Sequence, residues 1–202
     1  SGGMDVLIAC EYSATVRDAF RARGHDARSV DILPTEGDPR WHYQDDALQV
    51  ARSRRWDLVI AHPPCTRLTK AGVRWLHERD LWAEMREAAE FFRAFLELDV
   101  PKVAVENPVM HRYATEIIGR KQDQVVQPWM FGHLESKGTG FWLKGLPPLV
   151  PTENVREETM ALPAKERNRI HWAAPGPDRW KLRSKTYQGI ADAMAAQWGA
   201  TA

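Results

Sequence analysis

Short apolar runs rich in β-branched residues alternate along this chain with longer amphipathic stretches. The runs at residues 5–10, 58–61 and 101–105 each stop at polar or proline residues, which predicts buried strands. Residues 15–23 and 79–98 place apolar side chains three and four positions apart, which predicts helices. Strands that alternate with helices indicate an α/β fold with a mostly parallel sheet.

The rest of the pattern completes the expected elements. Residues 25–31 predict a second strand, and residues 109–118 predict a helix that ends at Gly119. Residues 124–127 predict a further strand. Apolar side chains four residues apart predict a last helix over 186–198.

Stretches rich in Pro, Gly and polar residues separate these elements. Residues 33–45 and 66–72 have the composition of loops, and three prolines within residues 145–151 mark a boundary. Residues 1–3, before Met4, are interpreted as a cloning scar and are left out of the fold.

Composition narrows the class of protein. The 202 residues, 44% of them hydrophobic, suffice for one domain with a sizeable core. The chain has no signal-peptide pattern and no apolar run of about 18 residues, so neither export nor membrane spanning is indicated. The two cysteines, Cys10 and Cys65, lie outside any CxxC or Cys/His cluster, which argues against a disulfide framework or a metal site and suits a reducing cytoplasm.

A cysteine follows the strand at residues 58–61 after two prolines. Pro63 and Pro64 cannot donate backbone hydrogen bonds, so they end the strand and stiffen the turn that carries Cys65. Ligands of open α/β sheets collect outside the carboxyl ends of the strands, which makes Cys65 a candidate nucleophile. A buried, unreactive thiol is the alternative, because most free cysteines pack as small apolar residues.

A carboxylate and an amide, Glu106 and Asn107, stand at the end of the strand at residues 101–105. The Pro-Cys pair and the later Glu-Asn pair resemble, in order and spacing, the nucleophile and proton-donor motifs of DNA cytosine carbon-5 methyltransferases. The resemblance implies a Rossmann-like, S-adenosylmethionine-dependent methyltransferase fold. It also implies that Cys65 is the nucleophile, Glu106 the proton donor and Asn107 its brace.

The first strand, turn, helix and second strand resemble the cofactor-binding unit of that family. The acidic residue that ends the second strand there takes the ribose hydroxyls, which implies this role for Asp31. The family usually has glycines in the first turn, and this chain has none, so Glu11 would compensate by contacting the cofactor. A solvated Asp31 in an ordinary crossover is the alternative. The resemblance implies these S-adenosylmethionine-binding residues: Cys10, Glu11, Tyr12, Ser13, Asp31, Ile32, Asp46, Pro63, Thr186 and Tyr187.

Residues 131–143 resemble the family's Gln-x-Arg-x-Arg strand motif, with Glu135, Lys137 and Thr139 at the three motif positions. Lys137 would supply a positive charge near the cytosine carbonyl or a phosphate, without the planar fork of Arg. A surface lysine on an edge strand is the alternative. The loop at 66–72 resembles the family's mobile loop that closes on the target base, and Lys137 or Arg67 would help to populate the Cys65 thiolate.

Positive charge gathers toward the C-terminus, although the net charge is only +1. Residues 165–185 hold seven Lys or Arg against two acids, interleaved with aromatic rings. Such a strip suits nucleic acid, because the charges bind phosphates and the rings stack on bases. Solvated basic loops are the alternative. The expected DNA-contacting residues are Pro64, Arg67, Lys70, Thr139, Arg167, Arg169, Trp172, Arg179, Lys181, Arg183 and Lys185.

The motifs together predict a catalytic domain over residues 4–150, completed by a C-terminal helix at 184–199. A small basic segment, residues 151–183, stands where family enzymes usually carry a large target-recognition domain. In this economy the chain resembles compact phage-type members that act in a bacterial or phage-infected cytoplasm. The resemblance implies transfer of a methyl group to carbon 5 of a flipped-out cytosine in DNA through a covalent Cys65 adduct.

Two alternatives stay open. One keeps the fold and changes the substrate to a nucleotide or RNA, or the cofactor to a carboxylated S-adenosylmethionine analogue, whose extra carboxylate Lys185 would suit. The other is a catalytically inactive homologue that binds DNA. The softened Gln-x-Arg-x-Arg motif favours the inactive homologue, whereas the retained Cys65 and Glu106 oppose it.

Overall fold

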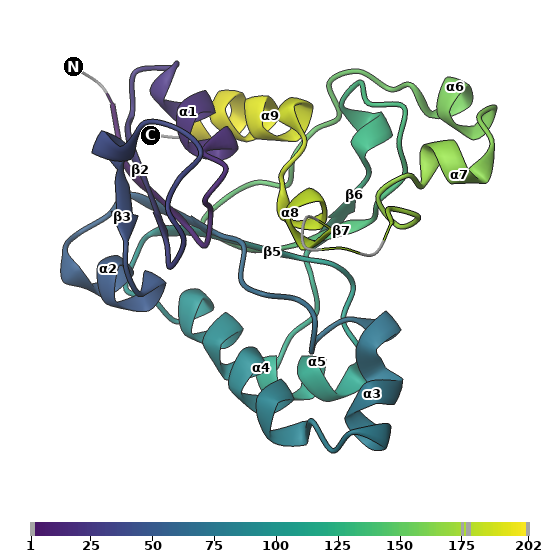
Figure 1. The fold of residues 1–202 in the computed structure, drawn as a ribbon. Helices are drawn as coiled ribbons and strands as arrows, with labels where there is room; N and C mark the ends of the chain where they lie inside the picture. Colours follow the sequence, from purple (N-terminus) through teal and green to yellow (C-terminus); the bar gives the residue numbers. More distant parts are fainter. Residues whose placement is uncertain (1–2, 175, 177–178, 201–202) are drawn as a thin grey trace.

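A central sheet organises the computed structural model, which describes residues 3–174, 176 and 179–200 (Figure 1). Residues 1–2 of the expected cloning scar lie outside the described part. The sheet has seven strands in the order β3-β2-β1-β4-β5-β7-β6. The strands are β1 Asp5–Ala9, β2 Asp26–Asp31, β3 His42–Gln44, β4 Leu58–Ala61, β5 Lys102–Asn107, β6 Gln124–Val126 and β7 Thr139–Lys144.

The sheet is mostly parallel. β3, β2, β1, β4 and β5 pair in parallel, whereas β7 is antiparallel to both of its neighbours, β5 and β6. All four residues of β4 are buried, as a short β-branched run between two helical layers requires. The expected class, a Rossmann-like α/β fold with a mostly parallel sheet, is confirmed by this topology.

Helices cover both faces of the sheet (Figure 1). One layer holds α1 Thr15–Arg21 and α9 Gln188–Gly199, and its core includes Phe20 and Trp198. The other holds α2 Ala47–Ser53, α4 Trp82–Leu96 and α5 Arg112–Ile118. Its core is built by Phe92, Phe95 and Trp142. The two layers bury nearly all of the apolar side chains whose spacing predicted strands and helices.

The remaining helices are short. α3 Val73–Glu78 follows the loop that carries Cys65. Between β7 and α9, the expected basic segment folds into α6 Arg156–Met160 and α7 Ala164–Arg167, and α8 Arg179–Ser184 begins within it. Three 3-10 helices complete the described elements: η1 Pro39–Trp41, η2 Lys70–Gly72 and η3 Pro128–Met130.

The structure corrects three expected elements. The helix expected over 79–98 begins only at Trp82, because Asp80 takes a positive φ of 50° and separates α3 from α4. The loop expected over 33–45 contains η1 and the edge strand β3. The helix expected over 109–118 begins at Arg112, where the His111 side chain accepts a hydrogen bond from the amide of Ala114 and caps it.

Within the described residues, no helix is both long and apolar enough to cross a membrane. In the same part of the chain, no three His, Cys, Asp or Glu side chains gather as metal ligands.

Candidate active site

The carboxyl ends of β4 and β5 bring the expected catalytic residues together. These strands are parallel neighbours, and Ala61 of β4 pairs with Val105 of β5. The next residues along the two strands are His62 and Glu106, which therefore lie side by side at the carboxyl ends of the two strands. Cys65 follows three residues after His62, and its thiol lies close enough to feel the charge of the Glu106 carboxylate.

Backbone and side-chain hydrogen bonds fix the turn that carries Cys65. The carbonyl of Cys65 accepts from the amides of Leu68 and Thr69, at 2.9 and 3.2 Å. The Nδ2 of Asn107 donates to the carbonyl of Pro63 at 3.1 Å. Asn107 thus ties the end of β5 to the cysteine turn, whereas the expected brace between Asn107 and the Glu106 carboxyl is replaced by His62.

His62 is the main partner of Glu106. Its Nδ1 lies 2.7 Å from Oε2 of Glu106, and the two side chains are only 7% and 20% exposed. Burial lowers the pKa of His62, but the hydrogen bond and charge of Glu106 outweigh it, so that pKa lies above its ordinary value. Burial likewise raises the pKa of Glu106, but His62 and Lys137 lower it on balance. The contact therefore favours an imidazolium paired with a carboxylate.

The Cys65 thiol stands among opposing charges. Burial and the Glu106 carboxylate raise its pKa, while Lys137 and Arg183 oppose that rise. Lys137 comes from the segment before β7, and its Nζ donates to the carbonyl of Arg183. The expected help from Arg67 is absent, because Arg67 pairs with Glu84 of α4 at 3.0 Å. Arg183, expected only as a DNA contact, takes its place.

The turn after β1 reaches the geometry of a glycine-rich turn without glycine. Cys10 and Ala14 adopt positive φ angles of 60° and 65°, in the region glycine usually fills. Both oxygens of the Glu11 carboxylate accept backbone hydrogen bonds at the start of α1, from Val16 and Arg17. Glu11 is therefore a helix cap, which is a structural use of the residue expected to contact the cofactor. Burial strongly raises the pKa of Cys10, so that thiol is inert.

The end of β2 presents an acid followed by an exposed apolar side chain. Asp31 accepts a hydrogen bond from the amide of Leu33 at 2.9 Å, and burial raises its pKa. Ile32 is 77% exposed, which is unusual for so large an aliphatic residue. Asp46 caps α2 by accepting from the amide of Gln49. Asp31, Ile32 and Asp46 thus lie together beside the turn after β1.

The other expected cofactor residues connect this turn to the C-terminal part of the chain. The hydroxyl of Tyr12 lies 3.1 Å from both the carbonyl of Lys181 and the Oγ of Ser184. Ser13 instead bonds Thr15 within the turn. Pro63 is buried and Thr186 is half-buried. Tyr187 donates to the carboxylate of Glu135, so its hydroxyl is engaged by the segment before β7.

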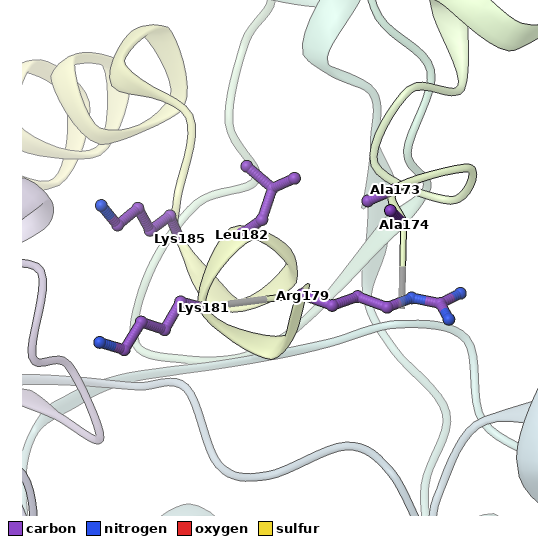
Figure 2. Close-up of a pocket in the computed structure, with 6 residues that line it drawn as sticks. All are labelled: Ala173, Ala174, Arg179, Lys181, Leu182 and Lys185. Carbon is purple, nitrogen blue, oxygen red and sulfur yellow. The ribbon is translucent and has the colours of Figure 1, made fainter. Parts of the chain in front are cut away.

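The basic segment is attached to the catalytic layers through polar contacts. Arg169 pairs with Glu135, and Lys185 pairs with Glu36 at 3.0 Å. An open hollow of about 450 Å³ lies beside α8, where Lys181 and Lys185 extend to one side and Arg179 reaches below Ala173 and Ala174 (Figure 2). Leu182 also lines it.

The remaining expected DNA contacts differ in exposure. Pro64 and Lys70 are exposed on the cysteine loop, and Trp172 of the basic segment is 58% exposed. Arg167 donates to the carbonyl of Leu162. Thr139 is buried at the start of β7, where its hydroxyl donates to the carbonyl of Lys137, so its side chain supports Lys137.

Sequence reasoning overlooked two histidines of this site. His62 follows the apolar run at residues 58–61, and His111 falls inside the helix expected over 109–118, so neither was given a role. His111 lies 2.8 Å from the carbonyl of Arg67 through Nε2 and so holds the cysteine loop. The pairing of His62 with Glu106 can be predicted only if the β4–β5 register is known and is extended by one residue beyond Ala61 and Val105.

Comparisons with known proteins give a faint likeness of fold. No family profile and no curated protein sequence matches the chain. A structure from E. coli, provisionally assigned as a prophage-encoded DNA modification methyltransferase, superposes at a TM-score of 0.46 and 15% identity over 80% of this chain. The Entamoeba histolytica methyltransferase EhMeth superposes at 0.48 and 12% identity over 75%. The chain spans 56% and 57% of the lengths of these two structures.

Proposed function

We propose that this chain is an S-adenosylmethionine-dependent DNA cytosine-5 methyltransferase. The observation that carries the proposal is the meeting of the Cys65 thiol and the Glu106 carboxyl at neighbouring parallel strand ends. Cytosine carbon 5 is a poor nucleophile, so its ring must first be attacked by a nucleophile and polarised by an acid. A thiol and a carboxyl held close together supply that combination.

The residues beside the turn after β1 fit S-adenosylmethionine. Asp31 offers a half-buried carboxylate for a ribose diol, and the exposed Ile32 offers an apolar face for an adenine ring. The positive φ angles of Cys10 and Ala14 let the turn pass close beneath a ligand. When bound, S-adenosylmethionine supplies the electrophilic methyl group.

The chain's own residues perform the remaining steps. The Cys65 thiol first gives its proton to solvent. The thiolate adds to carbon 6 of the flipped-out cytosine while the protonated Glu106 gives a proton to ring nitrogen 3, which leaves carbon 5 electron-rich. After methylation of carbon 5, loss of its proton to solvent expels the Cys65 thiolate. Nitrogen 3 then returns its proton to Glu106 and the thiolate takes up a proton from solvent, so the protein ends as it began.

Protonation of Glu106 also activates Cys65. Burial and the Glu106 carboxylate raise the pKa of the Cys65 thiol, whereas Lys137 and Arg183 lower it. When Glu106 carries a proton against the base, that negative charge disappears and only burial still opposes the two cations. The thiolate therefore forms more readily when the target base is in place than in the free protein.

The decisive experiment is nucleoside mass spectrometry of mixed-sequence DNA incubated with the protein and S-adenosylmethionine. We expect 5-methylcytosine from the wild type and none from Cys65→Ala. DNA binding without any new nucleoside from the wild type would exclude the methyl-transfer proposal.

The alternatives have weaker support. Lys185 would suit a carboxylated cofactor, but it already pairs with Glu36. A binding-only protein has no need of an acid and a thiol held together at strand ends. Parallel incubations with RNA and with free deoxycytidine nucleotides test the substrate alternatives in the same assay.

A further inference from the structure

We propose that His62 is a positioning residue that holds Oε2 of Glu106 through its Nδ1–H, so that Oε1 is the oxygen presented to the target pyrimidine. This inference rests on the proposed function and deepens it. The contact is 2.7 Å long and involves the residue directly after β4, to which the sequence analysis assigned no role.

The sheet itself builds this contact. The amide of His62 donates to the carbonyl of Ala9 at 2.9 Å, so its backbone extends the ladder with β1. Glu106 lies within β5, where it pairs with Phe141 of β7. Both side chains therefore project from hydrogen-bonded strands, and groups on rigid elements hold their geometry better than groups on loops.

The two oxygens of Glu106 have different surroundings. Oε2 is taken by His62, whereas no hydrogen bond from the described residues reaches Oε1. On the far side of the ring, Nε2 of His62 is buried and without a partner among the described residues. A histidine that only filled space or closed a network would be expected to satisfy both ring nitrogens.

Burial and three charged groups act on the ring. Burial and the ammonium of Lys137 oppose the imidazolium, while Glu106 on β5 and Glu11 in the turn after β1 favour it and raise the pKa of His62 on balance. Glu106 and Lys137 also act on Cys65, which lies in the same loop as His62. The two carboxylates therefore favour the state in which the pair holds one proton more than a neutral histidine beside a carboxylate.

That proton can be placed where the reaction needs it without changing the net charge. Before the base enters, moving the proton of Nε2 to Oε1 leaves a neutral ring beside a carboxylic acid. Nδ1–H still donates to Oε2, so the acid keeps its orientation. Oε1–H then passes its proton to nitrogen 3 as the sulfur of Cys65 bonds to carbon 6, and it recovers the proton when that bond breaks.

Two substitutions of His62 separate orientation from proton holding. His62→Gln keeps an N–H donor and removes the titrating ring, whereas His62→Phe removes both. For His62→Gln we expect near wild-type kcat at low pH and a loss of about tenfold or more near pH 8, since a positioned acid is worth about 10²–10⁴-fold. For His62→Phe we expect a loss at every pH, with KM for DNA within about twofold of wild type.

A matched control removes a buried histidine near the amino ends of the strands, away from the candidate site. His25, at the amino end of β2, holds the amide of Met4 at 3.0 Å, so His25→Gln perturbs the fold without touching the site. Its pH profile should follow the wild type. Wild-type kcat and pH profile in both His62 variants would overturn the proposal.

NMR titration of the His62 ring tests the pair without any turnover. Replacing the carboxylate in Glu106→Gln should lower the pKa of His62, and an unchanged pKa would overturn the proposed pairing. If the pKa of His62 falls as expected in Glu106→Gln but the wild-type protein methylates no DNA, the proposed function is excluded. The presentation of Oε1 to a pyrimidine is then excluded with it.

Discussion

The carboxyl ends of β4 and β5 with the loop that carries Cys65, here called the Cys65–Glu106 edge, and the basic segment are held in place by different forces. The edge is built on the sheet, with β4 fully buried and its backbone fixed by ladder hydrogen bonds. The basic segment has few buried side chains, none of them in α7, and is attached by polar contacts such as Arg169 with Glu135. Covalent chemistry needs the rigid arrangement, whereas contact with a long polyanion tolerates adjustment.

The largest effect should come from the rigid edge. Cys65→Ser replaces the thiol by a hydroxyl of similar size, and kcat should fall by at least about a thousandfold, the scale seen when a covalent nucleophile is removed. DNA affinity should stay within about twofold, because the basic segment is untouched. Rapid-quench methylation assays and fluorescence anisotropy measure kcat and DNA affinity on one preparation. A parallel loss of affinity would show that the two regions do not have separate roles.

The next effect should come from the basic segment. Arg179→Ala with Lys181→Ala removes two cations beside the hollow at α8. DNA affinity should fall by about tenfold, and the slope of log K against log salt should shrink by up to about 2, while kcat at saturating DNA is retained. Arg52→Ala with Arg55→Ala, two exposed cations near the end of α2 and outside the basic segment, is the matched control. A changed kcat with an unchanged salt slope would contradict this division of roles.

The same contrast explains which features the sequence could predict. Cys65, Glu106 and Asp31 each end a strand whose apolar run is local, so their shared edge follows from the α/β class alone. β3 was missed because its three residues lack an apolar pattern, and they pair only through contact with β2. The role of His62 depends on a partner 44 residues away and on strand register, which no local pattern contains.

The stability of the rigid edge should depend on pH through His62 and Glu106. The raised pKa of His62 contributes stability that is fully present below 6.5 and is lost as the pH rises through the folded value. The lowered pKa of Glu106 contributes stability that is present above 4.5 and is lost as the pH falls through its folded value. Between these limits, His62→Gln keeps an N–H donor but loses its charge and should cost about 1.5 kcal/mol, the difference between a charged and a neutral hydrogen bond, and less at about pH 9.

Urea unfolding of wild type and His62→Gln across this pH range measures that difference. A cost that does not vary with pH would mean that the ring is not charged in the folded protein. His25→Gln again serves as the control, because burial lowers the pKa of His25 and its stability contribution should grow, not shrink, as the pH rises.

The smallest expected effect concerns the attachment of the basic segment. The hydroxyl of Tyr187 donates to Glu135, which also holds Arg169, so one carboxylate links α9 to the basic segment. Tyr187→Phe removes one of these two contacts and should cost about 1 kcal/mol locally. Limited proteolysis should then cleave residues 151–183 a few times faster, with kcat and thermal unfolding of the sheet unchanged. Equal acceleration of cleavage within the sheet would show that the two regions unfold as one unit, and that the segment owes its position to more than this carboxylate.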